Sequence, residues 1–88
     1  MGVFSPYQLG PVRLRNRTVK AATFENLAPD GEVSDALVEF HRRVAAGGVG
    51  MTTLAYVSAS PEGRTYRDQL VMAPGVVPGL RRLTDAVH

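Results

Sequence analysis

Hydrophobic and polar residues follow two different periodicities along the chain, and each predicts a different kind of element. The runs Thr18–Thr23 and Met51–Val57 are short and nearly uncharged, with the composition of β-strands. After each run, apolar residues recur every three or four positions, as they do along one face of a helix. This order predicts strand, helix, strand, helix, which is typical of a parallel α/β fold.

The first helical segment has clear signals at both ends. Ser34 is a good N-cap residue, and Gly47 is a natural residue to end the helix. The predicted buried face carries the positions Leu37, Phe40, His41, Val44 and Ala45. We therefore interpret His41 as a packed or rim histidine. The glycine-rich run 47–50 lies between a helix and the next strand, so it is not a phosphate-binding loop, which precedes its helix.

Two further elements are predicted outside this unit. Residues 7–15 indicate a short hairpin that turns at Gly10-Pro11 and places Val12 and Leu14 on one face. Near the end of the chain, Pro78 suits the first turn of a second helix. The inner face of that helix is predicted to carry Val76, Leu80, Leu83 and Val87.

Two parallel strands do not make a complete sheet. Such strands need cover on both faces and partners on both edges. We therefore expect residues 1–88 to form an incomplete single domain, the N-terminal portion of a larger α/β barrel or sheet. The remainder of that domain is expected to be required for folding and activity.

Composition and charge exclude several classes of function. No apolar run approaches the roughly 20 residues of a membrane span, and the start of the chain lacks the pattern of a secretory signal. Nine arginines and one lysine against eight acids give a net charge of +2, without a concentrated basic patch. We expect no membrane or nucleic-acid partner. The absence of cysteine agrees with a cytoplasmic location.

Candidate chemistry gathers where the strands end. In α/β barrels and open sheets, active sites lie at the C-terminal ends of the strands. Ala21, Ala22 and Thr23 close the first strand, and residues this small either let a flat ligand approach the backbone or simply pack against a helix. Lys20 needs an acidic partner, a cavity or an anionic ligand. We favour an ion pair with a residue beyond this chain.

The second long loop offers charged candidates. Arg64, Arg67 and Asp68 either meet a substrate or pair with one another. No serine has a nearby base, and no spacing of His, Asp and Glu suggests a metal site.

Several short motifs, in order, resemble the N-terminal quarter of the old yellow enzyme family, the NADH:flavin oxidoreductases. The resemblance covers essentially the whole chain. It rests on Phe4-Ser5-Pro6, Leu14-Arg15-Asn16-Arg17, Gly47-Gly48-Val49-Gly50, Ser60-Pro61-Glu62-Gly63-Arg64 and Asp85-Ala86-Val87-His88.

The resemblance implies an FMN-binding (β/α)8 TIM barrel that passes hydride from NAD(P)H through the flavin to an activated alkene or a similar small-molecule acceptor. The hairpin would plug the bottom of this barrel. The flavin would be contacted, largely through backbone groups, by Ala21, Ala22, Thr23, Phe24 and Tyr56, and Asn26 would face the substrate. The family's catalytic residues would lie beyond His88, so none is assigned within the chain.

Three positions depart from the family pattern. Ala22 stands where many members have proline, Phe24 where many have cysteine or threonine, and Ala55 where glutamate is frequent. Backbone contacts survive these changes, whereas a side-chain contact from position 24 to the flavin does not carry over.

Two other functions fit the sequence. One is a non-catalytic barrel fragment or interaction piece that pairs its strand edges with another chain. The other is a barrel of different chemistry, such as an aldolase, because a fold alone does not determine a reaction.

Overall fold

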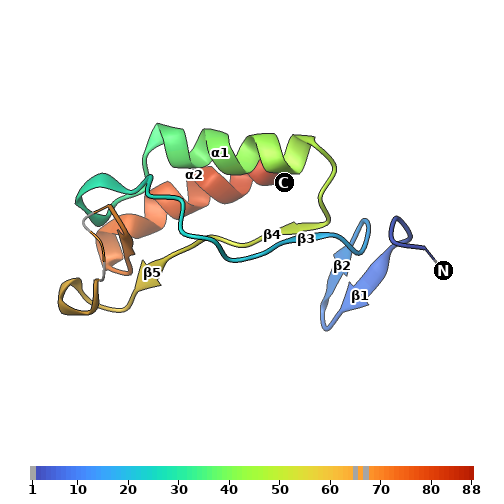
Figure 1. Cartoon of the computed structure of the whole chain (residues 1–88), viewed down its shortest axis with the longest axis horizontal. Coiled ribbons are helices and arrows are strands. Elements are labelled where there is room, and N and C mark those ends of the chain that lie inside the picture. The colour runs from blue at the N-terminus through green and yellow to red at the C-terminus, as the bar shows by residue number, and fades with distance from the viewer. Residues whose placement is uncertain (1, 65, 67) are drawn as a thin grey trace.

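The computed structural model describes residues 2–64, 66 and 68–88. Helices α1 (Asp35–Ala46) and α2 (Val77–Val87) lie side by side over a short parallel ladder, and a β-hairpin projects from one end (Figure 1). The molecule is elongated, with extents of 44 × 22 × 20 Å. The hairpin lies at the end where the ladder strands begin, opposite the end where they finish (Figure 1).

The ladder joins β3 (Val19–Lys20) to β4 (Met51–Thr52) in parallel, with Val19 opposite Met51. The predicted strands Thr18–Thr23 and Met51–Val57 are therefore too long. Each strand has a single partner among the described residues, so nothing continues the ladder past Lys20 and Thr52. A strand needs the hydrogen bonds of its neighbours in order to stay regular.

Helix α1 matches its prediction closely. The Ser34 side chain accepts a hydrogen bond from the Leu37 N–H at 3.1 Å, as an N-cap does. The side chains of Leu37, His41 and Ala45 are buried, whereas Phe40 is 36% exposed. Gly47 keeps a helical backbone, and the left-handed residue that ends the helix is the next one, Gly48, with φ +108°.

Helix α2 starts one residue before Pro78, which occupies its first turn as predicted. A 3₁₀ turn, η3 (Pro74–Val76), leads into it, and Leu83 on its inner face is buried. The hydrophobic core is small. A cluster within it consists of Ala28, Leu70 and Val76, with Val33, Leu54 and Leu80 packed around them.

The segment between the second ladder strand and α2 contains its own structure. Strands β5 (Val57–Ser58) and β6 (Leu70–Val71) form a second two-residue parallel pair, which the sequence did not predict. A 3₁₀ turn, η2 (Pro61–Gly63), lies between them, and another, η1 (Pro29–Gly31), precedes α1. The predicted loop is thus partly ordered by pairing.

The hairpin is confirmed. Strands β1 (Tyr7–Leu9) and β2 (Val12–Leu14) pair antiparallel around a two-residue turn at Gly10, whose φ is +55°. Val12 and Leu14 alternate with Arg13 along β2 as predicted, and of these two residues Leu14 is buried whereas Val12 is 54% exposed. The hairpin adjoins the start of the ladder, where Tyr7, Leu9 and Leu14 line a cavity together with Val19 of β3 and Met51 of β4.

Neither helix in the described part of the chain is long and apolar enough to cross a bilayer.

Candidate functional site

The residues that follow β3 form an open strand end. Ala21, Ala22 and Thr23 are exposed and have no regular structure. Within the described residues, none of the backbone N–H groups at positions 21–24 has a hydrogen-bond partner. Because the two alanines have no side chain beyond Cβ, a flat molecule with carbonyl or ring-nitrogen acceptors has direct access to these donors.

Three aromatic rings gather beside this strand end. The Phe24 ring stacks on Tyr56 and on Tyr66, with centroid separations of 5.1 and 4.6 Å. Tyr56 and Tyr66 remain 44% and 49% exposed. The fold therefore brings together Phe24 and Tyr56, which are 32 positions apart in the sequence and were both candidates. Tyr66 was not a candidate from the sequence.

Asn26 lies on the same segment and is exposed. Its backbone is left-handed, with φ +59°, a conformation that asparagine tolerates better than most residues. Next to it, the Glu25 N–H donates to the Ala55 carbonyl oxygen at 3.3 Å. This bond ties the segment after β3 to the segment after β4.

A buried group of polar side chains, the Glu25 cluster, lies behind these segments and consists of Lys20, Glu25, His41 and Thr52. Lys20 Nζ lies 3.3 Å from Glu25 Oε2, and His41 Nε2 lies 3.0 Å from Glu25 Oε1. His41 Nδ1 lies 2.8 Å from the Thr52 hydroxyl. The side chains of His41 and Glu25 are 0% and 2% exposed. All four side chains therefore have partners inside the fold.

This cluster corrects one prediction and confirms another. Lys20 does pair with an acid, but the acid is Glu25 of the same chain and not a residue beyond it. His41 is a packed histidine, as expected. Glu25 was not predicted to pair with Lys20, although a signal existed, because Glu25 is the first acidic residue after Lys20 and lies only five positions away.

The second long loop contributes less to this region. Arg64 lines a cavity of about 260 Å³ together with Asp30 and Glu32. Arg67 lies outside the described residues. Asp68 acts through its backbone, since its carbonyl oxygen accepts a hydrogen bond from the Ala28 N–H at 3.0 Å. These contacts leave the expected substrate role of the loop untested.

Two glutamates have a pKa below the usual value. Hydrogen bonds from Arg42 and then Arg43 lower the pKa of Glu39 from 4.5 to about 2. Hydrogen bonds from its own backbone N–H and from the Ser60 hydroxyl lower the pKa of Glu62. Both residues lie away from the strand end, so neither supplies an acid or base there.

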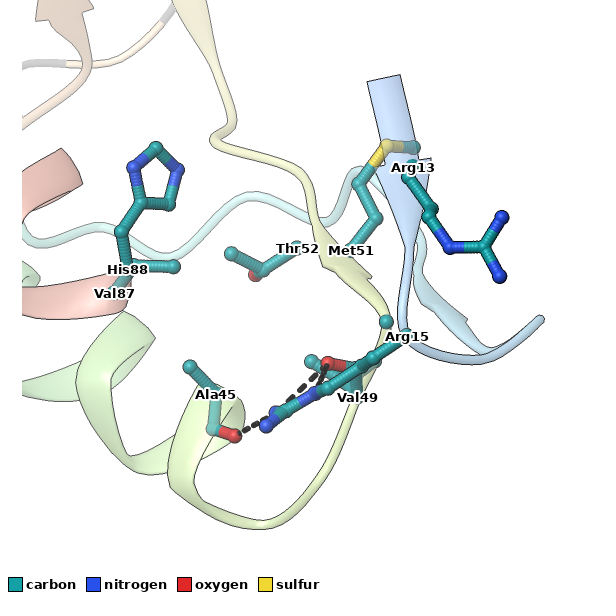
Figure 2. Close-up of a pocket in the computed structure, with 9 residues that line it drawn as sticks. Arg13, Arg15, Ala45, Val49, Met51, Thr52, Val87 and His88 are labelled. Carbon is teal, nitrogen blue, oxygen red and sulfur yellow. Dashed lines mark hydrogen bonds between the residues drawn. The ribbon is translucent and has the colours of Figure 1, made fainter. Parts of the chain in front are cut away.

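A cavity of about 320 Å³ lies at the opposite end of the ladder, near the hairpin (Figure 2). The Arg15 guanidinium points across it and donates to the carbonyl oxygens of Ala45 and Val49, whereas Arg13 points away. Ala45 is in the last turn of α1 and Val49 lies in the link that follows the helix, so Arg15 ties the end of the hairpin to both. We interpret this cavity as structural.

Comparison with known sequences gives one family. The profile of the NADH:flavin oxidoreductase / NADH oxidase family matches residues 2–88. A 4,4'-dithiodibutanoate disulfide reductase from Rhodococcus erythropolis is 62% identical over 86 residues, which are 98% of this chain and 21% of the relative. A metal reductase from Desulforamulus reducens is 39% identical over 86 residues, which are 98% of this chain and 13% of the relative.

Solved structures of related reductases superpose on this chain. A 2-naphthoyl-CoA reductase complex superposes with a TM-score of 0.91 at 30% identity, over 97% of this chain and 13% of the other. Morphinone reductase superposes with a TM-score of 0.89 at 25% identity, over 99% of this chain and 23% of the other. The chain thus spans about a quarter or less of the proteins it matches. The predicted fold class is confirmed: the arrangement is the hairpin and first β/α units of a (β/α)8 barrel.

Proposed function

Because the chain belongs to the NADH:flavin oxidoreductase / NADH oxidase family, we propose that it forms the first part of an FMN-dependent oxidoreductase. The reaction transfers hydride from NAD(P)H, by way of the flavin, to an activated alkene or a similar small acceptor. The remaining strands of the barrel come from the same reading frame in this proposal, and the enzyme works in the cytoplasm.

One observation carries the proposal: the strand end at residues 21–24 presents backbone N–H groups that have no partner among the described residues. An isoalloxazine ring has carbonyl oxygens and ring nitrogens along one edge, so its acceptors fit these donors. Ala21 and Ala22 leave the space that a flat ring needs. Ala21, Ala22, Thr23 and Phe24 would hold the ring on this side, together with the backbone at Tyr56.

When bound, FMN supplies the two-electron chemistry, because it can accept a hydride and donate it again. The residues of this chain supply binding and orientation. The stacked rings of Phe24 and Tyr56 offer an apolar surface beside the strand end, and Asn26 offers an exposed amide to the acceptor. No acid, base or nucleophile is assigned to this chain, because the family's catalytic residues would lie beyond His88.

A second acceptor class has specific support. The relative that is 62% identical is named a disulfide reductase, whereas the metal reductase is only 39% identical. An organic disulfide with short carboxylate arms is therefore a candidate acceptor. The balance is simple: NAD(P)H and one proton supply two electrons and two protons, the S–S bond breaks, and two thiols form.

Two alternatives remain distinct from this proposal. Family membership argues against a barrel of aldolase chemistry. A non-catalytic piece is tested by the reading frame: if it continues past His88 into further strands, the oxidoreductase is supported, and a stop codon there favours the interaction piece.

The experiment is expression of the complete reading frame, followed by visible absorption and anaerobic NADH and NADPH oxidation. We expect a yellow protein that releases FMN on heating. Activated alkenes and 4,4'-dithiodibutanoate are then compared as acceptors. A protein that binds no flavin, even after FMN is added, would overturn the proposed function.

A further inference from the structure

Glu25 connects several elements near the strand ends. Its carboxylate meets Lys20 in β3 and His41 in α1, and it also accepts the Ala55 N–H at 3.4 Å. Its own N–H donates to the Ala55 carbonyl oxygen at 3.3 Å. One buried residue therefore bridges β3, α1 and the segment after β4.

We propose that Glu25 is a positioning residue, which holds the two segments that face the flavin, residues 21–26 and 53–56, at a fixed separation. This inference rests on the proposed function, because only a bound flavin makes these segments a site. Glu25 itself touches neither cofactor nor substrate, since its side chain is 2% exposed.

The hydrogen bonds explain why the position matters. Glu25 lies between Phe24 and Asn26, so fixing its backbone and side chain fixes both neighbours. Across the gap, Ala55 precedes Tyr56 and is bonded to Glu25 through both its N–H and its carbonyl group. A side chain at position 25 without an acceptor oxygen, such as alanine, would leave the Ala55 N–H without this bond and would remove the side-chain link between the two segments.

Lys20 extends the same connection. Its ammonium group donates to Glu25 and also to the Thr53 carbonyl oxygen at 3.2 Å. Lys20 directly precedes Ala21, and Thr53 begins the facing segment. The lysine and the glutamate therefore link the segments twice, once through each charged group.

The pairing also has an electrostatic consequence. Lys20 and Glu25 neutralise each other beside the strand end, where burial keeps solvent from screening them. Replacing Glu25 by glutamine would leave a positive charge there, and replacing Lys20 by methionine would leave a negative one. A nearby positive charge favours the more negative, reduced flavin, so the two changes should shift the flavin midpoint potential in opposite directions.

A purely structural role for Glu25 makes a different prediction. If the Glu25 cluster only anchored α1 to the ladder, both replacements would weaken the fold and affect the flavin alike. Leu14→Ala provides the matched control, because Leu14 is buried at the hairpin end, away from the strand ends. It should lower thermal stability without altering either segment.

The first test uses the complete protein without flavin, and hydrogen–deuterium exchange is its readout. We expect Glu25→Ala to speed exchange several-fold in peptides covering both 21–27 and 53–57, and Leu14→Ala to leave them unchanged. Unchanged exchange at 53–57 in Glu25→Ala, or equal acceleration in Leu14→Ala, would overturn the proposal. This result stands even if the protein takes up no FMN, an outcome that overturns only the proposed function.

The second test uses the flavin-loaded protein. We expect Glu25→Gln to weaken FMN binding tenfold or more and to raise the midpoint potential, and Lys20→Met to lower that potential. The double variant Lys20→Met/Glu25→Gln removes both charges and should return the potential toward the starting value. Shifts of the same sign in both single variants, or none in either, would show that Glu25 does not act on the flavin site.

Discussion

Asn16 and Gly50 are in contact at the entrance to the ladder. A Cβ atom on Gly50 would lie 2.4 Å from the Asn16 carbonyl oxygen, closer than real Cβ atoms come. The Asn16 side chain also donates to the Gly48 carbonyl oxygen at 2.6 Å and accepts from the Thr18 N–H at 3.0 Å. The segments 14–17 and 47–50, two motifs that carry the family resemblance in the sequence, are thus in direct contact in the structure.

We predict that Gly50→Ala destabilises the complete protein, because the added methyl group must displace the Asn16 backbone. Overpacking of this kind costs about 1–3 kcal/mol. Gly47→Ala is the matched control, since Gly47 has a helical backbone and a Cβ there would meet its neighbours at 3.4 Å or more. Denaturant unfolding of both variants checks this. If Gly47→Ala lowered the free energy of unfolding as much as Gly50→Ala does, the contact between Asn16 and Gly50 would not be the cause.

The helices could be predicted because their signals are local. Ser34 caps α1 as expected, and the apolar spacing of three and four positions selected the buried Leu37 and Ala45. Capping and periodicity involve residues a few positions apart, so the sequence alone contains them. The strand lengths could not be predicted in this way, because they depend on partners far along the chain. Residues 21–24 have strand composition but no partner within the described residues, and they stay irregular.

The candidate site was predictable only in part. The position of Ala21 after the first strand follows from the alternation of strands and helices, whereas Tyr56 was a candidate only through the family resemblance. The stacking of Tyr66 on Phe24 does not, because it depends on how the second loop folds back. Lys20 indicated a need for an acid, yet the acid was expected at long range when Glu25 lay five positions away. Because β3 ends at Lys20, the irregular residues that follow it allow Glu25 to reach back to the Lys20 side chain.

We predict that Ala22→Leu weakens FMN binding in the complete protein, since the larger side chain would crowd a flat ring at the strand end. Overpacking of the leucine against the ring should destabilise the complex with FMN by about 1–3 kcal/mol. Ala46→Leu makes the same change at an exposed position in the last turn of α1, and it should leave FMN affinity as it is. Titration of flavin-free protein with FMN measures both. A folded Ala22→Leu variant of unchanged affinity would show that this strand end is not a wall of the flavin site.

We predict that Glu39 titrates near pH 2, well below its usual 4.5, because Arg42 and Arg43 hydrogen-bond to it and lower its pKa. A lowered pKa in the folded state means that these pairs favour folding above about pH 4.5 and lose that contribution as the pH falls toward 2. Glu39 is 43% exposed, so the effect on stability should be small. NMR titration of the carboxyl carbon measures the pKa. Arg42→Ala should raise it, and Arg81→Ala, on α2, should not.

The structure also explains what residues 1–88 should do when produced alone. Both parallel ladders have two strands of two residues each, and within the described residues their outer edges are unpaired. Large apolar side chains beside them remain exposed, including Val19 at 50% and Val57 at 38%. Unpaired edges and exposed apolar surface both favour association with other chains.

We therefore predict that the isolated 88 residues stay loosely folded or aggregate, do not oxidise NAD(P)H and do not hold FMN tightly. A barrel of this class typically needs about 250 residues, so most of the wall that would cover α1, α2 and the ladder is missing from such a sample. The helices should still form partly, because their caps and apolar faces are local. Circular dichroism, size-exclusion chromatography and an NADH oxidation assay measure these properties. A monomer that melts cooperatively and retains flavin would mean that two short ladders and one small core suffice for a stable domain.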